Sequence, residues 1–226
     1  MNVNTILTYL SDLETHNERE WYHANKTRYA EANREFEELI FQLMLELRKN
    51  DNNIPFVEPK ELTFKLMRDT RFSHDKSPYN PAFRAHIAPK GKLPIPVGYF
   101  LMLQPDGRSF LGGGLFADMF KDATTMIRDY LVAHGDEWEK IITAPDFTKY
   151  FAVQGTALKK TPQGYDQDHP QAEYLKNKSW YLEYHITDTQ LKDKDFIDFA
   201  TNIFLKMRDF NDFLNKALID FQMPAR

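Results

Sequence analysis

The sequence predicts a single α+β domain, spanning residues 1–226, in which N-terminal, central and C-terminal helices pack a mainly antiparallel sheet. Three observations lead to this fold class. Apolar residues recur with helical spacing at both ends and in the middle of the chain, several shorter segments alternate with period two, and no repeat, linker or low-complexity tract divides them. With 42% hydrophobic and 14% aromatic residues, the chain can bury a substantial core.

The N-terminal region reads as two helices. Residues 5–14 place apolar side chains on one stripe, and Thr5 is a candidate N-cap. Asn17 with Glu20 resembles a capping box that starts a second, longer helix, whose 3-and-4 rhythm continues to Arg48. The polar run KNDNN and the proline after it predict the end of this helix.

Alternation then predicts strands. LTFKLMRD at 62–69 alternates, and FRAHI at 83–87 alternates again, so that Arg84 and His86 share one face. The turn signal PDGR joins VGYFLMLQ at 97–104 to SFLGGG at 109–114, which predicts a β-hairpin. SWYLEYHIT at 179–187 is predicted as the last strand.

Helices return after the hairpin. Asp118 is a candidate N-cap, Gly135 is expected just past the helix end, and shorter helices are expected at 136–144 and 146–152. Residues 155–178 read as a loop, and 189–221 as helical. The GGG at 112–114 is interpreted as a tight turn, because neither a Walker pattern nor GxGxxG is present. We therefore predict no cofactor.

Composition narrows the functional class. No window is apolar enough for a membrane span and the start lacks a signal peptide, so we expect a soluble cytoplasmic protein without a membrane partner. The absence of cysteine removes thiolate chemistry. A net charge of −4 argues against nucleic acid as a partner. Residues 60–92 nevertheless contain eight Lys or Arg against three acids, a local charge of +5 that would attract a small anion.

The segment RDTRFSHDKSPY at 68–79 is the predicted site. Guanidinium groups suit bidentate contact with phosphate or carboxylate, so we predict a small anionic ligand in a basic cleft around residues 68–86. Its ligand-binding residues would be Arg68, Arg71, Lys76, Tyr79 and Arg84. Two alternatives stay open: a catalytic site, and a non-catalytic module for an acidic partner or nucleic acid in which the segment is a structural ionic clasp. Neither a reaction nor an oligomeric state follows from the sequence.

Candidates for proton transfer and metal binding are fewer. His86 is fixed beside Arg84 by its strand, whereas His74 and Asp75 are adjacent and need a turn to cooperate. Asp166, Asp168 and His169 carry metal-ligating groups, but their spacing matches no recognised ligand pattern. A turn or capping role is the favoured interpretation, and no metal is predicted.

Four blocks together resemble a known family. NEREWYHANKTRY, RDTRFSHDKSPY, a GYF strand leading to GGG, and PQGYDQDHP occur in the order seen in DUF2461, a conserved hypothetical protein family of unknown function. The resemblance spans nearly the whole chain. The first block departs from the usual form of the family, which has two asparagines and EWF, by carrying His16 and Tyr22. The resemblance implies an α+β domain of this size and assigns no activity or catalytic residue.

Overall fold

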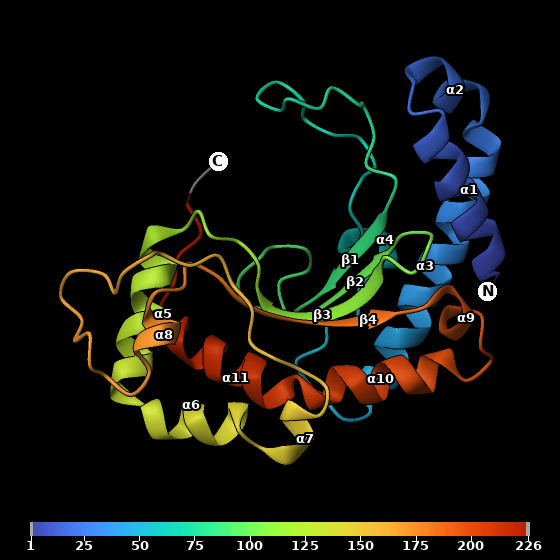
Figure 1. Cartoon of the computed structure of the whole chain (residues 1–226). Coiled ribbons are helices and arrows are strands. Elements are labelled where there is room, and N and C mark those ends of the chain that lie inside the picture. The colour runs from blue at the N-terminus through green and yellow to red at the C-terminus, as the bar shows by residue number, and fades with distance from the viewer. Residues whose placement is uncertain (1, 225–226) are drawn as a thin grey trace. The chain divides into compact units, whose positions relative to one another are not determined.

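The structure is a computed structural model that describes residues 2–224. Within that range the chain forms a four-stranded antiparallel sheet in the sequential order β1-β2-β3-β4, together with eleven helices (Figure 1). The strands are β1 (Phe83–Ile87), β2 (Tyr99–Leu103), β3 (Ser109–Leu115) and β4 (Trp180–Ile186). The predicted α+β class is therefore confirmed.

Most helices follow the predicted regions with shifted boundaries. The helices are α1 (Val3–Thr15), α2 (Arg19–Ala24), α3 (Lys26–Arg48), α4 (Pro59–Leu62), α5 (Lys121–Ala133), α6 (Gly135–Ile142), α7 (Pro145–Thr148), α8 (Ala172–Leu175), α9 (Asp188–Leu191), α10 (Phe196–Lys206) and α11 (Arg208–Ala217). However, α4 was not predicted, and α8 lies within residues 155–178, which were predicted to be a loop. None of these helices, within residues 2–224, is both long and apolar enough to cross a membrane.

The described chain divides into two compact units. The first comprises the described residues of Met1–Lys92 with Phe100–Leu111 and His185–Asn202. The second comprises Leu93–Tyr99, Gly112–Tyr184 and the described residues from Ile203 onward. Each unit has its own core and its own cavities.

The core of the first unit forms where α1 packs along α3. Their helical apolar stripes are fully buried, and the facing residues are Ile6, Leu10 and Leu13 of α1 with Phe36, Leu39, Ile40 and Leu43 of α3. β1 joins this core through Phe83, whose ring lies 5.1 Å from that of Phe36 between centroids. The segment between α4 and β1 leaves this core as a long loop (Figure 1, teal).

The core of the second unit is aromatic. Trp138 is fully buried, with its ring centroid 5.1 Å from Phe213 and 5.5 Å from Phe210, so that α6 packs on α11. α11 is amphipathic, because its apolar residues face this core while its charged residues face solvent. The helices thereby hold a polar surface of α11 next to α6 and α7.

The predicted helix starts need correction. Asn2 rather than Thr5 caps α1, since the Asn2 side chain accepts the Thr5 backbone N–H. The predicted long helix breaks at Asn25, where α2 ends and α3 begins. Polar residues near a helix start compete for the capping position, and spacing alone does not identify the residue that takes it.

The starts of three further helices, α2, α5 and α6, also differ from the predicted ones. Glu18 rather than Asn17 precedes α2, Phe120 rather than Asp118 precedes α5, and Gly135 begins α6 instead of lying past a helix end. None of these three starts is capped by a hydrogen bond from a side chain at the N-cap position. The side chain of Asn17 instead hydrogen-bonds the backbone of Tyr79.

The predicted strand at 62–69 was wrong. That segment makes isolated antiparallel bridges, Thr63 with Ala85 and Met67 with Tyr79, instead of a continuous ladder. The facing segment contains Pro78 and Pro81, which lack the N–H group that a ladder needs. Intermittent pairing leaves residues 68–77 free to form the loop.

The interpretation of GGG as a tight turn was also wrong, because all three glycines lie inside β3. Gly114 has φ +91°, and a Cβ there would lie 2.4 Å from the Trp180 carbonyl oxygen on β4. A Cβ at Gly113 would lie 3.0 Å from the Met207 sulfur. The glycines therefore permit close approach of backbone and helix, which is a packing role.

Candidate functional site

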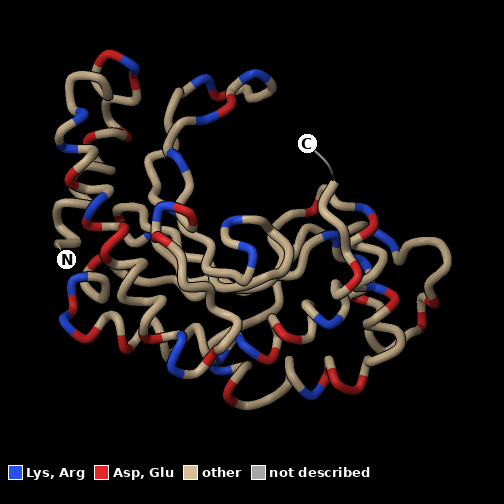
Figure 2. The backbone as a smooth tube through the Cα atoms, turned by 180° about the vertical axis from the view of Figure 1, so that it is seen from behind, with Lys and Arg blue, Asp and Glu red and all other residues tan. Residues whose placement is uncertain are grey.

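The loop at 68–79 is ordered largely by its own ion pairs. Arg71 makes a bidentate contact with Asp69, whose oxygens accept from Nε at 3.0 and 3.1 Å and from Nη2 at 2.6 Å. Arg68 pairs with Asp75, and Lys76 donates to the Thr70 carbonyl at 3.0 Å. Lys, Arg and acidic residues accordingly alternate along this loop (Figure 2).

These contacts set the charge states of the two aspartates. Hydrogen bonds from the Ser77 hydroxyl and from Arg68 hold the pKa of Asp75 well below its usual range. The Arg71 side chain similarly lowers the pKa of Asp69, and Asp69 raises the pKa of Arg71. Both aspartates are therefore ionised at neutral pH, and the loop is nearly neutral despite its three cations.

Asn17 ties this loop to the helical part of the same unit. Its side-chain amide donates to the Tyr79 carbonyl at 2.9 Å and accepts the Tyr79 N–H at 3.0 Å, across 62 positions of sequence. The Tyr79 ring stacks on Tyr22 of α2, with centroids 4.3 Å apart. Burial, chiefly, raises the pKa of Tyr22 to about 12, so both hydroxyls stay protonated at neutral pH.

A cavity of about 570 Å³ lies between α2 and this loop. Its lining carries the cations Arg19, Arg68 and Lys76, the acids Glu18 and Glu20, and the ring of His23. The remaining lining residues are Asn17, Tyr22, Met67, Thr70, Pro78 and Tyr79. The volume is within the range of about 300–1,000 Å³ that is usual for small-molecule sites.

Three of the five predicted ligand-binding residues thus come together, namely Arg68, Lys76 and Tyr79. Arg71 does not line the cavity: its side chain is 77% exposed and packs over the ring of Phe72, which is itself 93% exposed. Arg84 also lies elsewhere, with its Cζ 5.5 Å from the Phe64 ring centroid and Nη2 donating to the Lys65 carbonyl. Burial lowers the pKa of Arg84.

The candidates for proton transfer are dispersed. His86 is buried, not exposed on the sheet face, and its ring centroid lies 6.5 Å from that of Phe100. His74 is exposed on the loop, while the neighbouring carboxylate of Asp75 accepts from Ser77 and Arg68. Neither histidine lines the cavity beside α2.

The metal candidates belong to a turn in the second unit. Asp166 accepts the Asp168 N–H at 2.9 Å, and His169 Nδ1 accepts the Gln171 N–H at 3.0 Å just before α8. In the part of the chain that the structure describes, no three His, Cys, Asp or Glu side chains are grouped so that they could hold a metal ion. Local hydrogen bonding accounts for all of these contacts.

Sequence reasoning missed the wall of the cavity that α2 supplies. Arg19, Tyr22 and His23 are adjacent to Asn17 in the block NEREWYHANKTRY, yet none of α2 is buried. Arg19 and Glu20 on this six-residue helix are exposed, and the helix contributes no buried residue to the core. That feature, together with the aromatic pair Trp21 and Tyr22, is the signal that could have identified the wall.

Comparison with known proteins gives a family without an activity. No curated protein matches the chain, and no solved structure matches it. The model of one family matches residues 5–213, which is nearly the whole chain, and that family is described as a conserved hypothetical protein, DUF2461. Four sequence blocks, their order and this match agree, and the chain belongs to the DUF2461 family.

Proposed function

We propose that this protein is a soluble cytoplasmic protein that binds a small ligand bearing a phosphate or carboxylate group. The ligand would occupy the cavity between α2 and the 68–79 loop. The observation that carries the proposal is the convergence of Arg19, Arg68 and Lys76 on one cavity beside the stacked rings of Tyr22 and Tyr79. Cations and a flat aromatic wall together suit an anionic group attached to an organic body.

The charges favour a ligand with one anionic group. Glu18 and Glu20 line the same cavity and, with Asp75, which pairs with Arg68, they offset the charge of its three cations. A highly charged polyanion would meet repulsion from these carboxylates, whereas hydroxyl or amine groups of a smaller ligand could donate to them. The ion pair with Asp75 fixes the Arg68 guanidinium in advance, which reduces the entropy lost on binding.

An enzymatic form of this proposal would rely on His23. It is the histidine among the lining residues, and an imidazole is a common general acid or base. Its position on α2 puts it on the wall opposite the loop cations, where it would face the ligand. A proton-transfer role predicts that His23→Gln leaves affinity for the ligand unchanged while abolishing turnover.

One observation favours the alternative, a non-catalytic interaction module. Phe72 and Arg71 project from the loop, and the Arg71 Cζ lies 5.8 Å from the Phe72 ring centroid. Exposed aromatic and arginine side chains are typical anchors of protein interfaces. In that function, Arg71 and Phe72 would contact an acidic partner, and the pairs of Arg68 with Asp75 and Arg71 with Asp69 would act as the clasp that holds them.

A thermal-shift experiment distinguishes the small-anion site from the interaction module. Inorganic phosphate should raise the melting temperature of the native protein, since binding to the folded state stabilises it, and it should do so more than the polyanions pyrophosphate and citrate, which Glu18 and Glu20 repel. Arg19→Gln and Lys76→Gln should remove this response, whereas Lys65→Gln is the matched control, because it removes an exposed cation of the same unit outside the cavity. A response lost equally in Lys65→Gln, or absent in the native protein, contradicts the proposal.

The alternative has the opposite pattern. Binding of an acidic peptide, measured by fluorescence anisotropy, would be lost in Arg71→Gln and Phe72→Ser and kept in Lys76→Gln. The same titration with single-stranded DNA reports whether nucleic acid replaces the peptide. Failure of both anion and peptide to bind would leave the loop as a structural clasp alone.

A further inference from the structure

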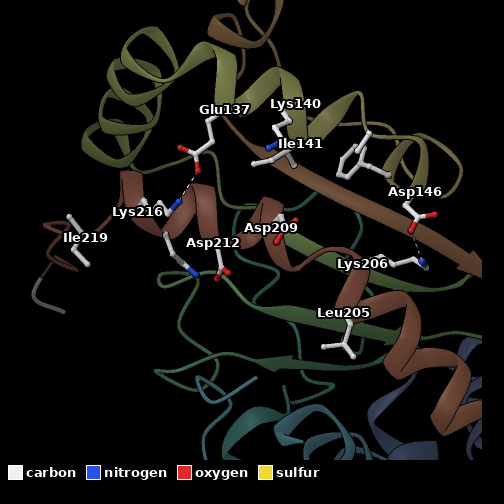
Figure 3. A pocket seen from close by; sticks show the side chains of 13 residues that line it. Glu137, Lys140, Ile141, Asp146, Leu205, Lys206, Asp209, Asp212, Lys216 and Ile219 are labelled. Carbon is white, nitrogen blue, oxygen red and sulfur yellow. Dashed lines mark hydrogen bonds and ion pairs between the residues drawn. The ribbon is translucent and has the colours of Figure 1, made fainter. Parts of the chain in front are cut away.

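A second cavity, of about 740 Å³, lies in the other unit between α6 and α7 on one side and α10 and α11 on the other. Figure 3 shows side chains from both sides projecting into the space. Its lining combines apolar side chains with charged ones. This combination, at this volume, is that of a small-molecule site in which a few polar groups orient an apolar ligand.

Ion pairs connect charged residues of the lining at two places. Lys216 on α11 contacts Glu137 on α6 at 2.7 Å, and Lys206 on α10 contacts Asp146 on α7 at 3.6 Å (Figure 3). Each pair joins residues from two different walls. The charges of these four side chains are therefore already matched within the protein.

Two other charges of the lining are unmatched. Lys140 projects from α6, and Asp209 projects from the opposite wall, at the first turn of α11 (Figure 3). Among residues 2–224, no hydrogen bond or ion pair engages either side chain. A cation and an anion thus face the same cavity without contacting each other.

Apolar side chains line the same cavity. Ile141 of α6 and Leu205 of α10 are half-buried, and Phe147 of α7 is almost fully buried. Three lysines and four carboxylates line the cavity, so the lining has no strong excess of one sign. A ligand with a single charge would leave either Lys140 or Asp209 without a partner.

We propose that this cavity binds a short apolar peptide or amino acid as its zwitterion. The ligand ammonium group would pair with Asp209, the ligand carboxylate would pair with Lys140, and the apolar side chains would pack on Ile141, Phe147 and Leu205. Because both protein charges are solvent-exposed, each pair strengthens binding only about two- to fivefold. Burial of the apolar side chains supplies most of the affinity.

The test is a titration of the whole protein with leucyl-leucine, followed by calorimetry and by shifts of backbone amide signals. N-acetyl-leucyl-leucine lacks the ammonium charge, and leucyl-leucinamide lacks the carboxylate. Each blocked peptide should bind the native protein about two- to fivefold more weakly than the free dipeptide. The shifted signals should belong to α6, α7, α10 and α11.

Variants of Asp209 and Lys140 test which charged group of the ligand each residue contacts. Asp209→Asn should weaken the free dipeptide and remove the difference between it and the acetylated form, while the difference from the amide persists. Lys140→Gln should give the reverse pattern. Asp136→Asn on α6 and Lys121→Gln on α5 are matched controls outside the cavity, and they should leave all three affinities unchanged.

Two results would overturn this proposal. One is the absence of saturable binding at millimolar dipeptide. The other is binding that distinguishes neither blocked peptide, or in which Asp209→Asn and Lys140→Gln behave as the controls do. Because the cavity uses no residue of α2 or of the 68–79 loop, failure here leaves the proposed anion site unaffected.

Discussion

The two units use the same pair of hydrogen bonds, from one asparagine side chain to a backbone distant in sequence, to fix two different segments. In the first, the Asn17 side chain pairs with both backbone groups of Tyr79. In the second, the Asn215 side chain accepts the Val97 N–H at 2.8 Å and donates to the Val97 carbonyl at 3.0 Å. Each asparagine also lines the cavity of its unit.

The two contacts differ in the burial of the segment around them and in the interactions of its neighbouring residues. Val97 is almost fully buried, and Asn211, one turn before Asn215 on α11, donates to the adjacent Gly98 carbonyl. The loop that ends at Tyr79 is exposed over most of its length and relies on Asp–Arg pairs within itself. The comparison indicates that the same pair of hydrogen bonds serves global stability in the second unit and local order in the first.

The largest expected effect follows from Asn215→Ala. Removing the side chain leaves a backbone donor and acceptor of Val97 unpaired in a buried environment, which costs about 1–3 kcal/mol in the free energy of unfolding. Urea denaturation measures this loss. Asn202→Ala, at an exposed position of α10, is the control and should change stability little. A loss in Asn215→Ala no larger than in the control would contradict the assigned role.

Asn17→Ala should have a smaller global effect, below about 1 kcal/mol, because the loop can open without unfolding the core. The local effect should be clear: amide exchange of Tyr79 should accelerate, and the thermal response to phosphate should disappear. Asn17→Asp keeps an acceptor for the Tyr79 N–H but places a carboxylate beside the Tyr79 carbonyl. It should therefore restore little of the protection. If Asn17→Ala and Asn215→Ala lowered the free energy of unfolding equally, the two asparagines would not differ in their contribution to global stability.

These asparagines also show why the sequence predicted the fold better than the site. Helices and the hairpin follow from periodicity and turn residues, which are local signals. Asn17 looked like a helix cap because such a cap needs only neighbouring residues, whereas its real partner is Tyr79, 62 positions away. Spacing cannot reveal a partner at that distance.

The loop itself shows what local reasoning can give. The pairs of Arg71 with Asp69 and Arg68 with Asp75 join residues two and seven positions apart, and they were among the alternatives that the sequence left open. The wall formed by Arg19 and His23 required knowledge of where α2 lies. Similarly, the failed strand at 62–69 depended on the prolines of the segment it faces.

The ion pairs of the two units should differ in their response to pH. The hydrogen bond with Glu137 raises the pKa of Lys216 in the second unit. A raised pKa means that the contribution of this pair is complete below the ordinary lysine pKa and is lost as pH rises through the raised value. Glu137→Gln should bring the Lys216 pKa back toward about 10.4, as followed by NMR of the side-chain signals. An unchanged Lys216 pKa in that variant would contradict the pairing.

The smallest effect is expected from lowering the pH, which acts on the Asp75 ion pair in the 68–79 loop. The pKa of Asp75 is lowered by Ser77 and Arg68, so its contribution is present above the ordinary aspartate pKa of about 3.9 and is lost only as pH falls through the lowered value. The Tyr79 amide should therefore stay protected below about pH 4. The energetic effect is small because the Asp75 side chain is 59% exposed.

Ser77→Ala sharpens this last prediction. It removes the hydroxyl that donates to Asp75 Oδ1 at 2.6 Å, so the Asp75 pKa should rise toward its ordinary value and loop order should be lost at a higher pH. Ser73→Ala is the control, since the Ser73 hydroxyl accepts only a long contact of 3.4 Å from Arg68. Carboxyl NMR titration measures the pKa, and amide exchange measures the order. If Ser77→Ala moved the Asp75 pKa without changing loop order, the ion pairs would follow the conformation of the loop instead of stabilising it.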